Sequence, residues 1–286
     1  MRTISGILSV MLLLCLFCGF AAAETAEDPA SVTTLDFGRR NLEISYIISE
    51  IEKYPNLEKV NMFATPVGIV NMGRLSERFP GITFGWTIRF KEHAIRSDSI
   101  VASTGLSYSS ARHPTRRIAL LRYCTQLKGL NIRYNACDDL AFTSGMNDLR
   151  VLVASDNLFT DVSPLAGRTS LEYLDLSGNK ITDISPLTGL TRLLVLNLSD
   201  NNIEDLAPLA KMTWLKQLWL YRAAGRGSGN QLSEETVQML KEALPDTEIF
   251  FTGRPDWKTD PYCKVMNRMF GSKKEYIPFE DSYPEE

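Results

Sequence analysis

From Leu127 onward the chain repeats itself every 22 residues, and no other feature limits its fold as strongly. Each unit opens with the pattern Leu-x-x-φ-x-φ, in which φ is apolar, and the opening residues are Leu127, Leu149, Leu171, Leu193 and Leu215. Fixed periods in this range are typical of solenoids, in which each repeat is one coil stacked on the next. Because a single coil cannot fold alone, the period predicts an array with capped ends.

Three further columns keep the same register. Asparagine stands eight residues after the first four leucines, at Asn135, Asn157, Asn179 and Asn201. Aspartate follows at Asp139, Asp161, Asp183 and Asp205, and proline at Pro164, Pro186 and Pro208. A carboxamide both donates and accepts, so the asparagines suit a bend whose backbone groups enter a dry interior. Proline fixes φ and presets the returning segment.

The best-preserved unit, LEYLDLSGNKITDISPLTGLTR at 171–192, resembles the 22-residue leucine-rich repeat of bacterial internalins. The resemblance covers roughly residues 121–221, and small exported leucine-rich-repeat proteins of anaerobic gut bacteria are closer in overall layout. It implies an α/β solenoid with a curved parallel sheet, a convex side of short helical, 3-10 or irregular segments, and a concave face that binds another macromolecule. The chain lacks the Leu-Pro-x-Thr-Gly sorting motif and the immunoglobulin-like region of internalins, so surface attachment and host-receptor binding are not implied.

Longer helical repeats are predicted on both sides of the regular array. Apolar starts 25 residues apart occur at Val32, Leu57 and, more weakly, Ile82, and helical stretches that stop at a proline precede the last two. The same arrangement returns at 237–251, after a helix start at Ser233. A last helix is predicted between Asp260 and Gly271, docked as a terminal cap through Tyr262, Val265, Met266, Met269 and Phe270 on one face.

Four segments are therefore predicted. They are a signal peptide at 1–23, a flanking region of longer, irregular repeats at 24–126, the regular repeats at 127–222, and a helical cap and tail at 223–286. Within the flanking region the repeat breaks down at 88–120, where only TFGWTIRF and SIVAST resemble strands. A hinge, an inserted hairpin and a degenerate pair of turns all fit this break.

The N-terminus predicts export. Arg2, the apolar run from Ile7 to Phe20 and the small residues Ala21-Ala22-Ala23 form a secretory signal, cleaved after Ala23. We therefore expect a secreted or cell-surface protein that meets the membrane only transiently. Without Arg2 the 31 basic residues become 30 against 34 acidic, a net charge of −4, which argues against nucleic acid as a partner.

Three cysteines remain after removal of the signal. Cys124 and Cys137 occupy columns that hold apolar residues in other units, so we interpret them as small buried side chains rather than a disulfide pair. Cys263 lies off the apolar stripe of the last helix, where a surface thiol and a dimer contact are both open.

No motif predicts catalysis, a cofactor or a metal. His93 and His113 lie in the irregular segment without metal-ligand spacing. The glycine-rich string at 225–229 lacks the lysine of a phosphate-binding loop and is interpreted as a joint into the cap. The stretch from Asp175 to Asn179 resembles a calcium loop but then has Lys180 where that loop needs glycine. We therefore expect a non-enzymatic protein.

The outward side of the predicted strands carries the candidate site. Exposed valines and aromatics there, rimmed by charge, suggest a partner surface. The predicted binding residues are Tyr173, Asp175, Asn197, Asp200, Trp219, Tyr221 and Arg222. An alternative for Trp219 and Tyr221 is internal burial under the 223–229 loop or the terminal cap.

These patterns predict an exported, non-enzymatic module that recognises a protein or peptide through its concave face. A glycan or small-ligand receptor that uses the same face is the alternative. An enzyme in the 88–120 break is a third hypothesis, for which loss of a hydrolytic activity on His93→Ala or His113→Ala would be the sign.

Overall fold

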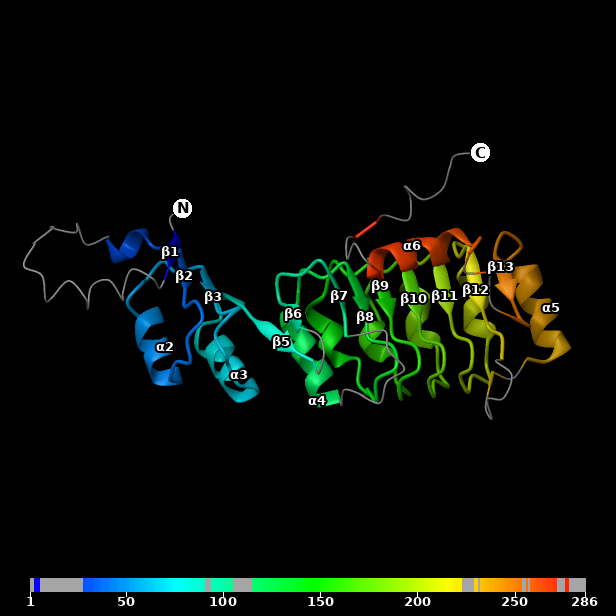
Figure 1. The fold of residues 1–286 in the computed structure, drawn as a ribbon. Helices are drawn as coiled ribbons and strands as arrows, with labels where there is room; N and C mark the ends of the chain where they lie inside the picture. The colour runs from blue at the N-terminus through cyan, green and yellow to red at the C-terminus, as the bar shows by residue number, and fades with distance from the viewer. Residues whose placement is uncertain are drawn as a thin grey trace, which may run out of the picture. The chain divides into compact units, whose positions relative to one another are not determined.

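The computed structural model describes residues 3–5, 28–90, 94–104, 115–222, 229–230, 232–253, 256, 258–271 and 276–277. The chain divides into two compact units at Ile88 and Arg89 (Figure 1). The predicted flanking region 24–126 is therefore shared between them. None of the helices in the described ranges is long and apolar enough to cross a membrane.

Unit 1 contains the predicted longer repeats. Its parallel sheet has the order β1-β2-β3-β4, and α2 and α3 lie in the connections. The elements are β1 (Thr3–Ser5), 3-10 helix η2 (Pro29–Ser31), β2 (Thr34–Asp36), α2 (Ile44–Ile51), β3 (Lys59–Asn61), α3 (Ile69–Arg78) and β4 (Thr83–Gly85). The predicted starts at Val32, Leu57 and Ile82 thus each lead into a strand. Of the predicted signal segment only Thr3–Ser5 is described, paired with β2, and the rest lies outside the described residues.

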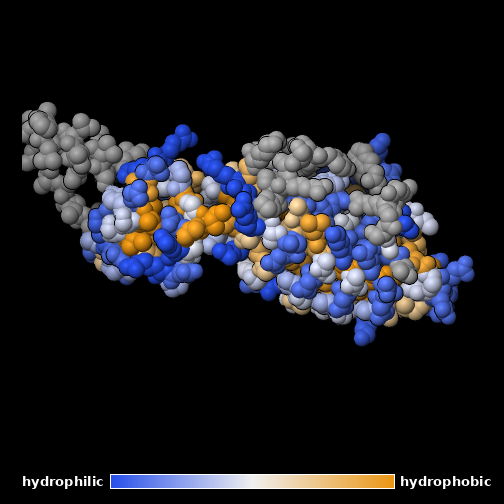
Figure 2. Space-filling view, turned by 90° about the horizontal axis from the view of Figure 1, so that it is seen from below, coloured by the Kyte–Doolittle hydropathy of each residue, from blue (hydrophilic) through white to orange (hydrophobic). Residues whose placement is uncertain are grey.

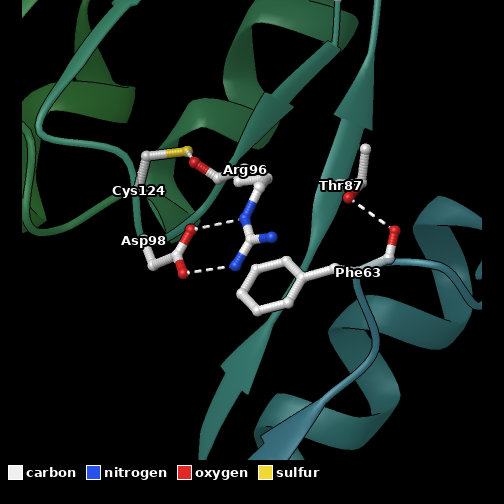
Figure 3. Close-up of polar contacts among 5 residues, drawn as sticks. All are labelled: Phe63, Thr87, Arg96, Asp98 and Cys124. Carbon is white, nitrogen blue, oxygen red and sulfur yellow. Dashed lines mark hydrogen bonds and ion pairs between the residues drawn. The ribbon is translucent and has the colours of Figure 1, made fainter. Parts of the chain in front are cut away.

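The irregular segment contains one strand pair and one repeat strand. β5 (Thr87–Arg89) and β6 (Ala94–Arg96) form a two-stranded sheet, whereas β7 (Val101–Ser103) is the first strand of the long sheet. Arg96 donates from Nε and Nη2 to the Asp98 carboxylate at 2.9 and 2.7 Å, and Cys124 Sγ lies 3.9 Å from the Arg96 carbonyl oxygen (Figure 3). In unit 1, Thr87 Oγ1 donates to the Phe63 carbonyl at 2.6 Å. The two strand regions predicted in this segment, TFGWTIRF and SIVAST, are confirmed by β4, β5 and β7.

Unit 2 is a stack of coils around a seven-stranded parallel sheet of order β13-β12-β11-β10-β9-β8-β7. The strands are β8 (Gly129–Asn131), β9 (Val151–Val153), β10 (Tyr173–Asp175), β11 (Val195–Asn197), β12 (Gln217–Trp219) and β13 (Glu248–Phe250). Strands β8 to β12 pair in the 22-residue register, for example Leu152 with Leu174 and Leu174 with Leu196, whereas β13 pairs with β12 at a separation of 31 residues, Leu218 with Ile249. Leu152, Leu174, Leu196 and Leu218 are fully buried and form one column of the core.

The returning side of each coil is short and mostly 3-10 helical. Its elements are α4 (Thr115–Ile118), η3 (Ala119–Tyr123), η4 (Ala141–Gly145), η5 (Ser163–Leu165), η6 (Ser185–Gly189) and η7 (Ala207–Lys211). The aspartate column explains where η4 to η7 begin, because Asp139, Asp161, Asp183 and Asp205 each accept from the backbone N–H two residues on, at 2.7–2.9 Å. At Asp183 this bond lowers the pKa of the carboxyl.

The asparagines form a ladder between coils. Asn201 Oδ1 accepts from Ile181 N of the preceding coil at 3.1 Å, and its Nδ2 donates to the carbonyls of Leu176 and Leu198 at 3.0 Å each. Asn179 and Asn157 make the same contacts one and two coils earlier, respectively. The sequence interpretation missed one rung, Asn230, which accepts from Ile203 N at 3.2 Å. Its spacing from Asn201 is 29 residues instead of 22, so the period does not reveal it.

Two more helices follow the array. α5 (Glu234–Ala243) begins at the predicted cap, where Ser233 Oγ accepts from Thr236 N at 3.1 Å, and leads into β13. α6 (Pro261–Phe270) is capped by Asp260, whose Oδ1 accepts from Cys263 N at 2.8 Å. Both predicted helices are confirmed. Figure 1 shows that α5 lies beside the last strand, whereas α6 crosses the sheet itself.

Two cysteines are part of the coil core. Cys124 and Cys137 are fully buried, and no disulfide joins the three cysteines of the described residues. Burial raises the pKa of the Cys124 thiol to about 12, so its thiolate is absent at neutral pH. The interpretation of both residues as small apolar side chains is confirmed.

Candidate functional site

One row of side chains runs across the sheet of unit 2 on the side away from the core leucines. It lies two positions after each opening leucine, where the strands are in register. The row consists of Gly129, Val151, Tyr173, Val195 and Gln217, all of them buried. We call this side of the sheet the α6 face, because α6 covers it (Figure 1).

The apolar stripe of α6 packs on this row. Tyr262, Val265, Met269 and Phe270 recur at helical spacing and are 0–6% exposed. They form one cluster with Val101, Val151, Val153, Tyr173, Val195 and Trp219. Since these residues lie on the opposite side of the sheet from Leu174 and Leu196, the cluster is a second apolar core, separate from that of the coils.

Gly129 fits the C-terminal end of α6 because it has no side chain. A Cβ atom at this position would lie 2.9 Å from Met269 Sδ and 3.5 Å from Phe270 Cζ. The matching positions on β9 and β11 hold Val151 and Val195. The row therefore has a side chain at β9 and β11 but none at β8, where Met269 and Phe270 of α6 fill the space instead.

Polar contacts hold the N-terminal end of α6. Asp260 Oδ2 accepts from Gln217 Nε2 at 2.7 Å, and the same nitrogen donates to Glu248 Oε2 at 2.9 Å. Trp219 Nε1 donates to Gln217 Oε1 at 3.3 Å, and its ring meets the Phe250 ring edge-on at 6.2 Å. These bonds fix which turn of α6 lies over β12.

A charged cluster holds the chain after α6. Glu172 is 4% exposed; its Oε1 accepts from Arg150 Nη1 at 2.7 Å and lies 3.6 Å from Arg192 Nη2. Tyr276 donates from its hydroxyl to Glu172 Oε2 at 3.1 Å, and its ring lies under the Arg150 guanidinium. Burial, with the neighbouring carboxylate, raises the pKa of Tyr276 to about 12.

The predicted binding residues differ in how far they are exposed. Tyr173, Asn197, Asp200 and Trp219 are 3–8% exposed, Asp175 and Tyr221 are half-buried, and Arg222 is exposed. For Trp219 the alternative of burial under the terminal helix is the one observed. Tyr221 packs at the edge of the same cluster. Burial also raises the pKa of the Tyr173 phenol well above its ordinary value.

A polar strip adjoins the apolar cluster. It consists of Arg133, Ser155, Asp175, Ser177 and Ser199, near the ends of β8 to β11. Asp175 Oδ1 accepts from Ser177 N at 3.0 Å, as Asn131 Oδ1 does from Arg133 N and Asn197 Oδ1 from Ser199 N. Burial raises the pKa of Asp175, opposed by the bonds from Ser177 and the charge of Arg133. Asn is therefore the residue that this position favours.

Replacing Asp175 by asparagine is expected to stabilise the fold by on the order of 1 kcal/mol. The Ser177 N–H keeps its acceptor, and the ionised carboxylate no longer has to be buried. Because the folded pKa of Asp175 is raised, this gain is present at neutral pH, shrinks as the pH falls below that pKa, and is gone below the ordinary pKa of an aspartate, where Asp175 is protonated in the folded and the unfolded chain. Chemical denaturation as a function of pH measures it, and an equal or lower stability at neutral pH would contradict it.

Glu172, Gln217 and Gly129 are the site residues that the sequence interpretation missed. Gln217 and Gly129 stand in the outward columns, but neither is aromatic or charged, so neither was selected as a binding residue. The only signal was the row itself, in which Gly129 is the one position without a side chain.

Apolar surface outside the α6 face is limited in unit 2. Among the described residues, the exposed large apolar side chains are Tyr46, Ile69 and Val70 in unit 1, and Ile100 and Leu158 in unit 2. Figure 2 shows apolar surface on the face of unit 1 that is turned to the viewer. In unit 2 the face beneath α6 carries a cluster of buried apolar side chains.

The residues with candidate chemistry add no further site. Within the described ranges no three His, Cys, Asp or Glu residues are grouped so as to hold a metal ion. His93, His113 and the string 225–228 lie outside the described residues. In the calcium-like stretch, Asp175 is occupied by Ser177, whose N–H and hydroxyl both bind its Oδ1.

The fold defines the class of protein as a leucine-rich repeat protein. A family model described as "Leucine Rich repeats (2 copies)" matches residues 169–210 and 191–234, and the predicted fold class is confirmed. No curated protein matches the chain.

Solved structures with similar folds include two internalins of Listeria monocytogenes. One (inlF) is 23% identical over 78% of this chain, with a TM-score of 0.45, and the other (inlC2) is 22% identical over 79%, with a TM-score of 0.41. A leucine-rich repeat protein of Leptospira interrogans is 20% identical over 77% of this chain, with a TM-score of 0.44. The chain spans 56%, 81% and 46% of these three chains. Similarity at this level concerns the fold alone.

Proposed function

We propose that the chain is an exported, non-enzymatic binding module that recognises a protein or peptide segment through the α6 face, the side predicted to be concave. Export rests on the predicted signal at 1–23. The binding surface includes the predicted residues Tyr173, Asp175, Asn197, Asp200 and Trp219, with Tyr221 and Arg222 at its rim.

The observation that carries this proposal is the helix seated on that face. α6 buries an apolar stripe on the valine and aromatic row, and polar groups on the sheet bind the segment at both ends through Gln217 and Glu172. Such a combination of apolar row and flanking polar groups is suited to an amphipathic segment of polypeptide. A similar segment of another protein is therefore a chemically matched ligand.

The glycan alternative has less support from this geometry. A sugar ring stacks on an open aromatic face, but Tyr173 and Trp219 are only 4% and 6% exposed. Their neighbours Val151, Val153 and Val195 offer no hydrogen bonds from their side chains. The row matches apolar side chains of a peptide better than hydroxyl groups.

The test uses the rim of the face, which is accessible while α6 is in place. Peptides are selected from a displayed library on the full chain, and their affinity is then measured for Tyr221→Ala, Arg222→Ala and the control Lys211→Ala on η7. We expect each rim substitution to weaken binding about tenfold, as for a typical interface hot spot, and the control to leave it unchanged. Selected peptides that bind all three variants alike would place the binding surface elsewhere.

A further inference from the structure

We propose that α6 is an exchangeable occupant of the α6 face, and that the external ligand is an amphipathic helix of the same chemistry that displaces it. This inference rests on the proposed function and names its partner class. The ligand helix has an acidic cap at its N-terminus and apolar side chains spaced as Tyr262, Val265, Met269 and Phe270 are in α6.

The first support is that the coils do not depend on α6 for their core. Leu152, Leu174, Leu196 and Leu218 are fully buried on the other side of the sheet, and the asparagine ladder lies within the coils. α6 is the last described helix of the chain. Its departure therefore exposes the second core and leaves the first one closed.

The second support comes from the polar anchors, which each keep a partner when α6 leaves. Gln217 Nε2 retains Glu248 at 2.9 Å after losing Asp260. Glu172 retains Arg150 at 2.7 Å after losing Tyr276. A buried polar contact is usually costly to break because one group is left buried without a partner. Undocking of α6 avoids this cost at both Gln217 and Glu172.

The third support is the space above Gly129, which makes the face selective. At β8 the missing side chain of Gly129 leaves the space in which Met269 and Phe270 lie. A competing helix needs a flexible or aromatic apolar residue at its C-terminal end to fill this space. The outer surface of α6, which includes Lys264, Asn267 and Arg268, is exposed and sets no such requirement.

The experiment measures binding in trans of a labelled peptide that corresponds to residues 258–271, with Cys263→Ser to avoid oxidation. The full chain is compared with Met269→Glu, which places a charge in the buried stripe of α6 and is expected to undock α6 without changing the sheet, and with Asn267→Glu, a control of equal charge on the exposed side of α6. A fourth protein carries Met269→Glu and Gly129→Val, since valine occurs in this row on β9 and β11 and closes the space at β8.

We expect Met269→Glu to bind the peptide at least tenfold more tightly than the full chain and Asn267→Glu, and Gly129→Val to abolish that gain. A folded Met269→Glu chain without gained binding overturns the proposal, as does a gain that survives Gly129→Val.

Hydrogen exchange on the unsubstituted chain decides the matter if Met269→Glu does not fold. Amides of α6 that exchange while those of β9 to β11 remain protected support the proposal, and α6 amides that exchange only together with the sheet overturn it.

The proposed function and this inference fail differently. Library peptides that depend on Tyr221 and Arg222 but bind the full chain and Met269→Glu equally leave the function standing and remove the exchange. Absence of any peptide ligand for both proteins removes the function.

Discussion

Asn201→Ala is expected to lower the free energy of unfolding by about 3–5 kcal/mol. The side chain is fully buried and makes four hydrogen bonds, one from Ile181 N and three to carbonyl oxygens of two coils. Alanine leaves the Ile181 N–H without its acceptor in a dry interior, at a cost of about 1–3 kcal/mol. It also removes the three bonds to carbonyl oxygens, each worth about 0.5–1.5 kcal/mol, although these oxygens keep other donors in Asn179, Asn230 and the Gly178 N–H. Urea or guanidinium denaturation of the purified chain measures the loss.

Asn202→Ala is the matched control. Asn202 is the next residue in the chain, and its contact with the preceding coil is a backbone bond, from its N–H to the Ile181 carbonyl at 2.9 Å, which alanine keeps. Its substitution is expected to change stability by less than about 0.5 kcal/mol. Equal effects of the two substitutions would show that the ladder does not stabilise the stack.

Trp219→Ala is expected to cost about 3–5 kcal/mol, the usual loss for a large buried aromatic side chain. Trp219 joins the second core, contacts Phe250 of β13 and orients Gln217, which holds the start of α6. Its removal should therefore loosen α6 as well as lower the melting temperature. Thermal unfolding and hydrogen exchange of residues 261–270 measure the two effects.

Trp219→Phe tests whether the stability contribution of Trp219 comes from its buried apolar area. Phenylalanine keeps most of the buried apolar area, so the stability loss should be well under half of that for alanine. An alanine variant with unchanged stability and unchanged α6 exchange would contradict the burial of Trp219, and would return it to the surface that the sequence analysis predicted.

Much of the fold could be predicted because each repeat column has a local physical cause. The leucines alternate with the strand period, the asparagines satisfy the bend, and the aspartates begin the 3-10 helices, so every unit repeats the same signals. Asn230 shows where this stops, since an insertion between β12 and α5 shifts the rung by seven residues. The 22-residue period therefore identifies ladder residues only in coils without an insertion.

The candidate site was harder to predict because exposure is not a local property. The alternation that places Tyr173 and Trp219 away from the core leucines is correct, yet both are buried by a helix more than 40 residues further along the chain. The amphipathic stripe of α6 indicated that it packs against something. Its partner was not specified, because an apolar stripe fits any apolar surface of suitable width.

By itself the sequence determined the stacked coils, the helical repeat of α5 and β13 that follows them, and the helical nature of residues 261–270, since these follow from periodicity and from capping residues near in the chain. Only the tertiary structure decided that α6 occupies the α6 face, because Asp260 meets Gln217, Tyr276 meets Glu172 and Met269 meets Gly129 across separations that no local pattern records. Apolar burial drives such docking without direction, and the few polar contacts and the missing side chain of Gly129 give it a unique place.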